Sequence, residues 1–163
     1  MEDDADALFE LREWMSARDL DALRVRLRAW ESRRSPDGSE QWLNWIAVDD
    51  EPAAWVQATI RPDVALVAYA VLPARRGEGI ATEVVVAVTS WLHEQHPVVE
   101  AHIADDNLAS QAVARRAGFV RTNRTRGGEA VWEHIQRQWP SYREYEQTAH
   151  RELRIFRLTP AKA

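Results

Sequence analysis

The chain has 163 residues, a formal net charge of −5 at pH 7 and no cysteine. This length is typical of one domain, and the acidic balance argues against a general nucleic-acid-binding protein, because non-specific binding to phosphodiesters depends on many basic contacts. The absence of cysteine excludes disulfides, thiolate zinc sites and a cysteine nucleophile. No apolar stretch reaches the roughly 18 residues of a membrane span, so we expect no membrane partner and a soluble cytoplasmic protein with one domain over residues 1–163.

The first half of the chain predicts one helix and several strands. Residues 8–14 fit an edge strand or a helix, and we favour the strand. A capping box at residues 16–19 precedes apolar residues at helical spacing as far as Trp30. Three strand-like segments follow, separated by short turns, which predicts an antiparallel meander. These segments are residues 42–48, 54–60 and 64–71.

The second half alternates between helices and strands. A long helix is expected from about residue 79 to 95, and a strand with inward-facing Val99, Ala101 and Ile103 follows Pro97. Gly118 is well placed to end the next helix as its C′ residue. The remaining expected elements are a helix at 107–117, a hairpin of 119–123 with 129–135, and a strand at 153–158.

Residues 71–82, which read VLPARRGEGIAT, join an apolar strand to a helix through two glycines. Gly77 and Gly79 stand where the first N–H groups of the helix have no intrahelical acceptor and where the helix dipole is positive. Glycine allows close approach of the backbone, and Arg75 and Arg76 add positive charge. The junction therefore predicts a pyrophosphate site, although a strand–glycine–helix connection can also be a plain turn. The GxxxxGK[ST] and GxGxxG spacings are absent, which disfavours a P-loop or a dinucleotide fold.

A second motif lies in residues 106–119, which read DNLASQAVARRAGF. It places Asn107 and Ser110 at the start of a short helix that follows a strand, and Gly118 and Phe119 at its end. Asn107 is also a natural helix N-cap, and Ser110 can be an ordinary helix residue bonded to its own backbone. These alternatives remain open for both residues.

The two motifs together resemble the GNAT superfamily of acyl-CoA-dependent N-acetyltransferases, most closely the branch that acetylates ribosomal-protein N-termini. The resemblance covers residues 42–120 well. It implies an α/β (α+β) fold with a mixed, mostly antiparallel twisted sheet of about seven strands, helices on both faces, and a splay between the fourth strand (64–71) and the fifth. The core is expected over residues 42–135, with 136–163 as a C-terminal extension, a final strand or part of a homodimer interface.

The resemblance also implies the site residues. Ser110 would point toward the thioester sulfur as the candidate catalytic residue, Asn107 would contact pantetheine, and no metal is expected. The implied acetyl-CoA-binding residues are Val71, Leu72, Pro73, Arg76, Gly77, Glu78, Gly79, Ile80, Ala81, Thr82 and Asn107.

The ionisation states of the reacting groups determine which catalytic groups acetyl transfer to an amine needs. An amine of lysine type has a pKa of about 10.4, so a base or a desolvated pocket must supply the neutral nucleophile at pH 7. A free backbone N–H at the end of the 64–71 strand can stabilise the oxyanion. Many relatives carry a tyrosine acid where this chain has Ala114, which leaves Ser110, a water or no acid at all. Glu100 and His102 are candidate bases or solvated strand residues, and Tyr69 lines the acceptor pocket or satisfies a buried hydrogen bond.

We therefore expect an acetyl-CoA-dependent N-acetyltransferase that acts on a primary amine, either a protein N-terminus or a small molecule. The alternative is a catalytically weak acyl-CoA-binding sensor, which Ala114 and the missing base motivate. The region after the second motif is basic within an acidic chain, and one or two of its arginines could meet the 3′-phosphate of CoA or an acidic acceptor. These arginines are Arg115, Arg116, Arg121, Arg124 and Arg126.

Overall fold

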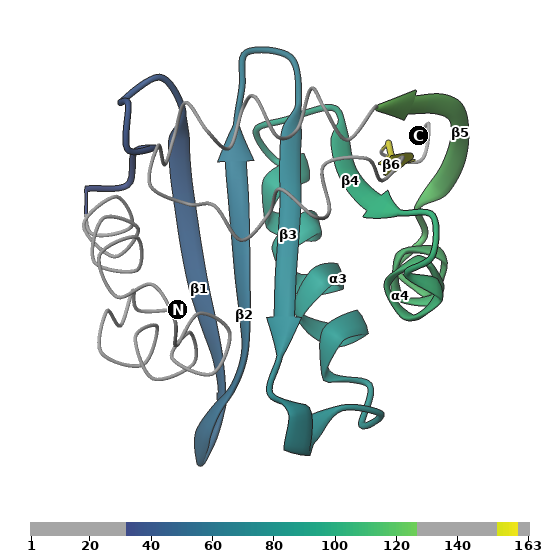
Figure 1. Ribbon diagram of the computed structural model, residues 1–163. Helices are drawn as coiled ribbons and strands as arrows, with labels where there is room; N and C mark the ends of the chain where they lie inside the picture. Colours follow the sequence, from purple (N-terminus) through teal and green to yellow (C-terminus); the bar gives the residue numbers. More distant parts are fainter. Residues whose placement is uncertain (1–31, 127–152, 160–163) are drawn as a thin grey trace.

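The computed structural model describes residues 32–126 and 153–159. Its strands form one six-stranded sheet in the order β1-β2-β3-β4-β6-β5 (Figure 1). In chain order, the elements are β1 (Gln41–Asp49), β2 (Glu51–Ile60), β3 (Ala65–Val71), a 3₁₀ turn (Pro73–Arg75), α3 (Ile80–His93), β4 (Val99–Ala104), α4 (Leu108–Arg116), β5 (Val120–Arg126) and β6 (Leu153–Leu158).

The sheet confirms the predicted mixed α/β fold. Strands β1, β2 and β3 form the expected antiparallel meander, β6 pairs antiparallel with both β4 and β5, and β3 with β4 is the one parallel pair in the described sheet. About seven strands were expected, and six are present in the described ranges. The expected strand at 8–14, the helix after residue 16 and the strand at 129–135 lie outside the described residues.

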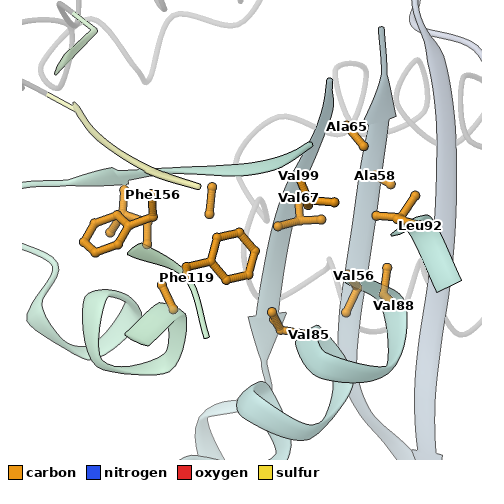
Figure 2. Close-up of a cluster of buried hydrophobic side chains, with 13 residues drawn as sticks. Val56, Ala58, Ala65, Val67, Val85, Val88, Leu92, Val99, Phe119 and Phe156 are labelled. Atoms are coloured by element: carbon orange, nitrogen blue, oxygen red, sulfur yellow. The ribbon is translucent and has the colours of Figure 1, made fainter. Parts of the chain in front are cut away.

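Helix α3 covers one face of the central strands because its apolar positions recur every three or four residues. Val85, Val88 and Leu92 are each at most 2% exposed. In Figure 2 the side chains of Val88 and Leu92 lie beside Val56 and Ala58 of β2. Burying a side chain of this size contributes about 1.5–3 kcal/mol. The packing fixes α3 against the sheet, and with it the glycine loop from which the helix starts.

The junction between β3 and β4 opens along its length. The two strands pair only at Ala65 with Val99 and at Leu66 with Glu100, and Figure 1 shows β4 diverging from β3 beyond this point. We call the paired part the closed half of the junction and the part beyond Leu66 and Glu100 the open half. Helices α3 and α4, which follow these two strands, contact each other next to the open half. This geometry confirms the predicted splay.

The helix boundaries agree with the expected caps. Gly79 is the N-cap of α3, and Asn107 is the N-cap of α4. Gly118 has φ 89°, a left-handed conformation that favours glycine at a helix C′ position. In the part of the chain that the structure describes, no helix is both long and apolar enough to cross a bilayer.

Candidate active site

The glycine loop presents backbone donors in front of α3. Gly77 and Gly79 have φ of 87° and 89°, and a Cβ added at either position would meet no atom within 4 Å. The N–H groups of Thr82 and Glu83 bond to the Gly79 oxygen at 3.0 and 3.2 Å. Within the described ranges, the N–H groups of residues 77–81 have no acceptor. Together with the positive end of the helix dipole, these donors fit a pyrophosphate.

A cavity of about 580 Å³ runs from this loop to α4 and brings the two sequence motifs together. Nine of the predicted site residues line it: Val71, Arg76, Gly77, Gly79, Ile80, Ala81, Thr82, Asn107 and Ser110. Three others lie outside its lining. The Leu72 N–H bonds to Ala53 O at 3.0 Å, Pro73 begins the 3₁₀ turn, and the Glu78 carboxylate pairs with Arg75 at 2.8 Å.

The open edge of β3 directs further backbone groups toward the gap between the strands. The Ala65 N–H points toward β4 and bonds to Val98 O at 3.0 Å. Because backbone groups alternate along a strand, the N–H and C=O of Tyr69 and Val71 point to the same side, where β4 no longer pairs. The Val71 oxygen accepts a hydrogen bond from Arg76 Nε at 3.4 Å. The edge therefore offers N–H donors to a ligand that lies in the open half.

Asn107 caps α4 and also lines the cavity. Its Oδ1 accepts the Ser110 N–H at 3.0 Å, which confirms the N-cap interpretation. The same residue lines the cavity, as does Ser110. The α4 helix thus begins at the cavity wall, and its first turn faces the open edge of β3.

Tyr69 crosses the open half from the strand to the helix. Its hydroxyl donates a hydrogen bond to the Ser110 backbone oxygen at 3.2 Å, and the residue lines the cavity. Burial raises the pKa of Tyr69, and the hydrogen bond with Ser110 offsets part of that increase. The phenol is therefore protonated near neutral pH.

The arginines differ in their surroundings. Arg75 lines the cavity, but its guanidinium lies 2.8 Å from a carboxylate oxygen of Asp49 and 2.8 Å from one of Glu78. Hydrogen bonds with these carboxylates raise the pKa of Arg75. Its charge is therefore balanced within the protein. Of the basic residues near the second motif, Arg116 lines the cavity, whereas Arg115 lies 5.9 Å from the Phe156 ring centre.

A charged cluster lies on the face of the sheet opposite α3. Because Val99, Ala101 and Ile103 pack in the core beside α3, the alternating side chains of β4 point to the other face. Glu100 is 4% exposed there, and its carboxylate bonds to Arg157 Nε at 3.0 Å, His102 Nε2 at 3.1 Å and Arg124 Nη1 at 3.3 Å.

Within this cluster, the two candidate bases, Glu100 and His102, have different environments. Burial raises the pKa of Glu100, but hydrogen bonds from Arg157 and His102 outweigh it, so the pKa is lowered overall. A carboxylate that is held ionised by several donors is a weak base. His102 lies two residues further along β4, in the open half, and its side chain is 16% exposed.

Several lining residues were absent from the predicted site. They are Tyr69, Ala70, Arg75, Ala109, Ala112, Val113 and Arg116. The four in α4 are spaced i, i+3, i+4 and i+7, which is one face of a helix. Since Asn107 already marked the start of α4, the helical periodicity after it could have predicted which α4 residues line the cavity.

The model of the acetyltransferase (GNAT) family matches residues 5–119. The chain belongs to the GNAT acetyltransferase family. This membership makes it an N-acetyltransferase with acetyl-CoA as its cosubstrate. No curated protein sequence matches this GNAT chain at a significant level. Within the described ranges, no group of three His, Cys, Asp or Glu residues could hold a metal ion.

Solved acetyltransferase structures share the fold. The ribosomal-protein-S18-alanine N-acetyltransferase of Escherichia coli is 16% identical, with TM-score 0.65 over 98% of this chain and 90% of that one. Mycobacterium smegmatis RimJ in complex with CoA-disulfide is 16% identical, with TM-score 0.67 over 96% and 77%. The microcin C7 self-immunity acetyltransferase MccE, in complex with acetyl-CoA and AMP, is 13% identical, with TM-score 0.66 over 96% and 87%. At these identities, the likeness establishes the GNAT fold.

Proposed function

We propose that this protein transfers an acetyl group from acetyl-CoA directly to a primary amine. The observation that carries the proposal is the single cavity that joins the glycine loop, the open edge of β3 and the start of α4. Each of these three parts offers the hydrogen-bonding groups that one section of the acetyl-CoA molecule requires. The acceptor is a protein N-terminus or a small-molecule amine.

Different residues bind the successive sections of acetyl-CoA, from the pyrophosphate to the thioester. The N–H groups of residues 77–81 and the positive end of α3 hold the pyrophosphate, with Arg76 beside them. Val71 and Asn107 flank the path of the pantetheine arm from this loop into the open half. The thioester then lies between β3 and α4, next to Tyr69 and Ser110.

The reacting groups meet across the sheet. A backbone N–H at the open end of β3, from Tyr69 or Val71, stabilises the oxyanion that forms on the carbonyl oxygen. His102 on the opposite face takes the proton from the attacking amine, through its Nδ1 when Nε2–H donates to Glu100. Glu100 is thus an anchor for the histidine ring. The amine displaces the thiolate directly, without an acyl-enzyme.

Calorimetric titration of acetyl-CoA tests the proposed cradle. Gly79→Asp places a carboxylate beside the pyrophosphate donors and strains a residue with φ 89°. We expect affinity to fall at least roughly 100-fold, since each tenfold loss is about 1.4 kcal/mol and a charge-assisted hydrogen bond contributes about 1.5–3 kcal/mol. Gly38→Asp is the matched control, because Gly38 also has positive φ (74°) and open space but lies in a turn away from the cavity.

The outcomes are distinct when circular dichroism shows both variants folded. Equal binding by Gly79→Asp and the wild type contradicts the cradle. Absence of binding by the wild type overturns the proposed function. Tight binding without thiol release over a panel of peptide and small-molecule amines instead supports the acyl-CoA sensor.

A further inference from the structure

The cavity contains few groups that can give a proton to the thiolate that leaves acetyl-CoA; this inference rests on the proposed function. Among the described residues that line the cavity, hydroxyl groups belong to Tyr69, Thr82 and Ser110. Aliphatic hydroxyls and guanidinium groups hold their protons too tightly to serve as acids near neutral pH, whereas a phenol has a pKa of about 10. Thr82 also belongs to the first turn of α3, at the pyrophosphate end.

The position of the Tyr69 hydroxyl is fixed by α4. It donates to the Ser110 oxygen at 3.2 Å, and in an α-helix that oxygen also accepts the N–H of residue 114. Ala114 is 2% exposed and belongs to the core, so its methyl group supplies no polar atom at this point. The phenol of Tyr69 therefore reaches the backbone beside Ala114 from the opposite wall of the open half.

We propose that Tyr69 is a catalytic residue that donates its hydroxyl proton to the departing thiolate of CoA. The amine nitrogen forms the C–N bond and gives its proton to His102. When the C–S bond breaks, its electron pair goes to sulfur, and the Tyr69 proton moves to that atom. The resulting tyrosinate regains a proton from solvent and the His102 imidazolium releases one to it, so the products are the amide and the free thiol.

The Tyr69 hydroxyl can turn to the sulfur without leaving its acceptor unpaired. Its hydrogen bond goes to the Ser110 oxygen, which in an α-helix also accepts the N–H of residue 114. Because burial raises the pKa of Tyr69, the phenol still carries its proton when charge begins to build on sulfur. A thiol has a pKa of about 8.5, which makes complete transfer uphill and limits the gain to about the lower end of general-acid catalysis, roughly 100-fold.

Tyr69→Phe removes the hydroxyl and keeps the ring. We expect kcat with acetyl-CoA to fall roughly 10- to 100-fold, with the Kd for acetyl-CoA and the unfolding temperature nearly unchanged. Thr89→Val is the matched control, because the buried Thr89 Oγ1 also donates to a helix oxygen, that of Val85 at 2.7 Å, outside the cavity. This control should keep the wild-type kcat.

Ser110→Ala separates the two hydroxyls beside the sulfur. The bond from Tyr69 goes to the backbone oxygen of Ser110, so this variant leaves it intact. A kcat loss larger in Ser110→Ala than in Tyr69→Phe overturns the inference, as does wild-type kcat in Tyr69→Phe or a loss confined to Kd and KM. If the wild type itself shows no turnover with any amine, the proposed function fails instead, and calorimetry with acetyl-CoA distinguishes that case.

Discussion

The two halves of the β3–β4 junction consist of the same two strands but have different roles. In the closed half, Ala65 and Val99 are fully buried, and the Ala65 N–H bonds to Val98 O at 3.0 Å. In the open half, the N–H groups of Tyr69 and Val71 face a gap in which β4 no longer pairs. Backbone groups that are satisfied within the sheet hold the fold together, whereas those that the sheet leaves unpaired are available to a ligand.

The side chains on the opposite face repeat this division. Glu100 stands beside Leu66 in the last strand pair and is nearly fully buried among cationic partners. His102 comes two residues later, where the corresponding position of β3 is the exposed Ala68. The difference between the halves predicts that equivalent changes will damage stability in one and catalysis in the other.

Proline substitutions in β3 test this division most strongly. Val71→Pro removes an N–H that points into the open half, so we expect kcat to fall roughly 100- to 1000-fold, as when an oxyanion donor is lost. The fold should remain, because no ladder bond to β4 is lost at this position. Ala65→Pro removes the bond to Val98 O and should destabilise the protein by about 1–3 kcal/mol, the cost of leaving a buried acceptor unpaired. Steady-state kinetics and urea unfolding measure the two effects.

The reverse pattern contradicts the comparison. If Val71→Pro unfolds the protein while Ala65→Pro is tolerated, the open edge is structural. If Val71→Pro keeps both its stability and the wild-type kcat, the oxyanion donor is another group, and the Tyr69 N–H becomes the one to test.

His102→Gln sharpens the comparison on β4. Glutamine keeps a polar side chain of similar length but cannot act as a base near neutral pH. We expect kcat to fall roughly 100-fold with little change in unfolding temperature, because general-base catalysis contributes about that much. Acetyl-CoA affinity should be unchanged, since His102 lies outside the cavity lining. A variant with wild-type kcat at every pH between 6 and 9 would remove His102 from the mechanism.

Much of the fold could be predicted because its signals are local. Apolar runs and turns located β1, β2 and β3, and the Asn107 and Gly118 caps bounded α4. The pairing of β5 with β6 could not be predicted in this way, since 26 residues lie between them and strand order depends on contacts distant in sequence. Sequence patterns give elements more readily than partners.

The site was predictable to the extent that it consists of backbone. The glycine spacing indicated the loop at Gly77 and Gly79, and the strand end at Val71 followed from the chain order. Three predicted residues, Leu72, Pro73 and Glu78, lie outside the lining because a continuous motif alternates between inward and outward directions. The span of Tyr69 to Ser110 joins residues that are far apart in the sequence, so no local pattern reveals it.

Glu100→Gln gives the smallest effect and tests how the closed half stabilises the fold; unfolding is the readout, because Glu100 also anchors the His102 ring. Because the pKa of Glu100 is lowered in the folded protein, its ionised form stabilises the fold above the ordinary carboxyl pKa of 4.5, and this contribution is lost as pH falls through the lowered value. At pH 7 we expect the variant to be about 2 kcal/mol less stable, the range of a hydrogen bond to a charged group. Urea unfolding from pH 7 to pH 3 should show this gap closing below about pH 4.5, whereas Glu51→Gln, at an exposed position, should show almost no gap. A gap that persists unchanged at pH 3 would mean that the Glu100 side chain stabilises the sheet by packing, and that the arginines around it contribute little.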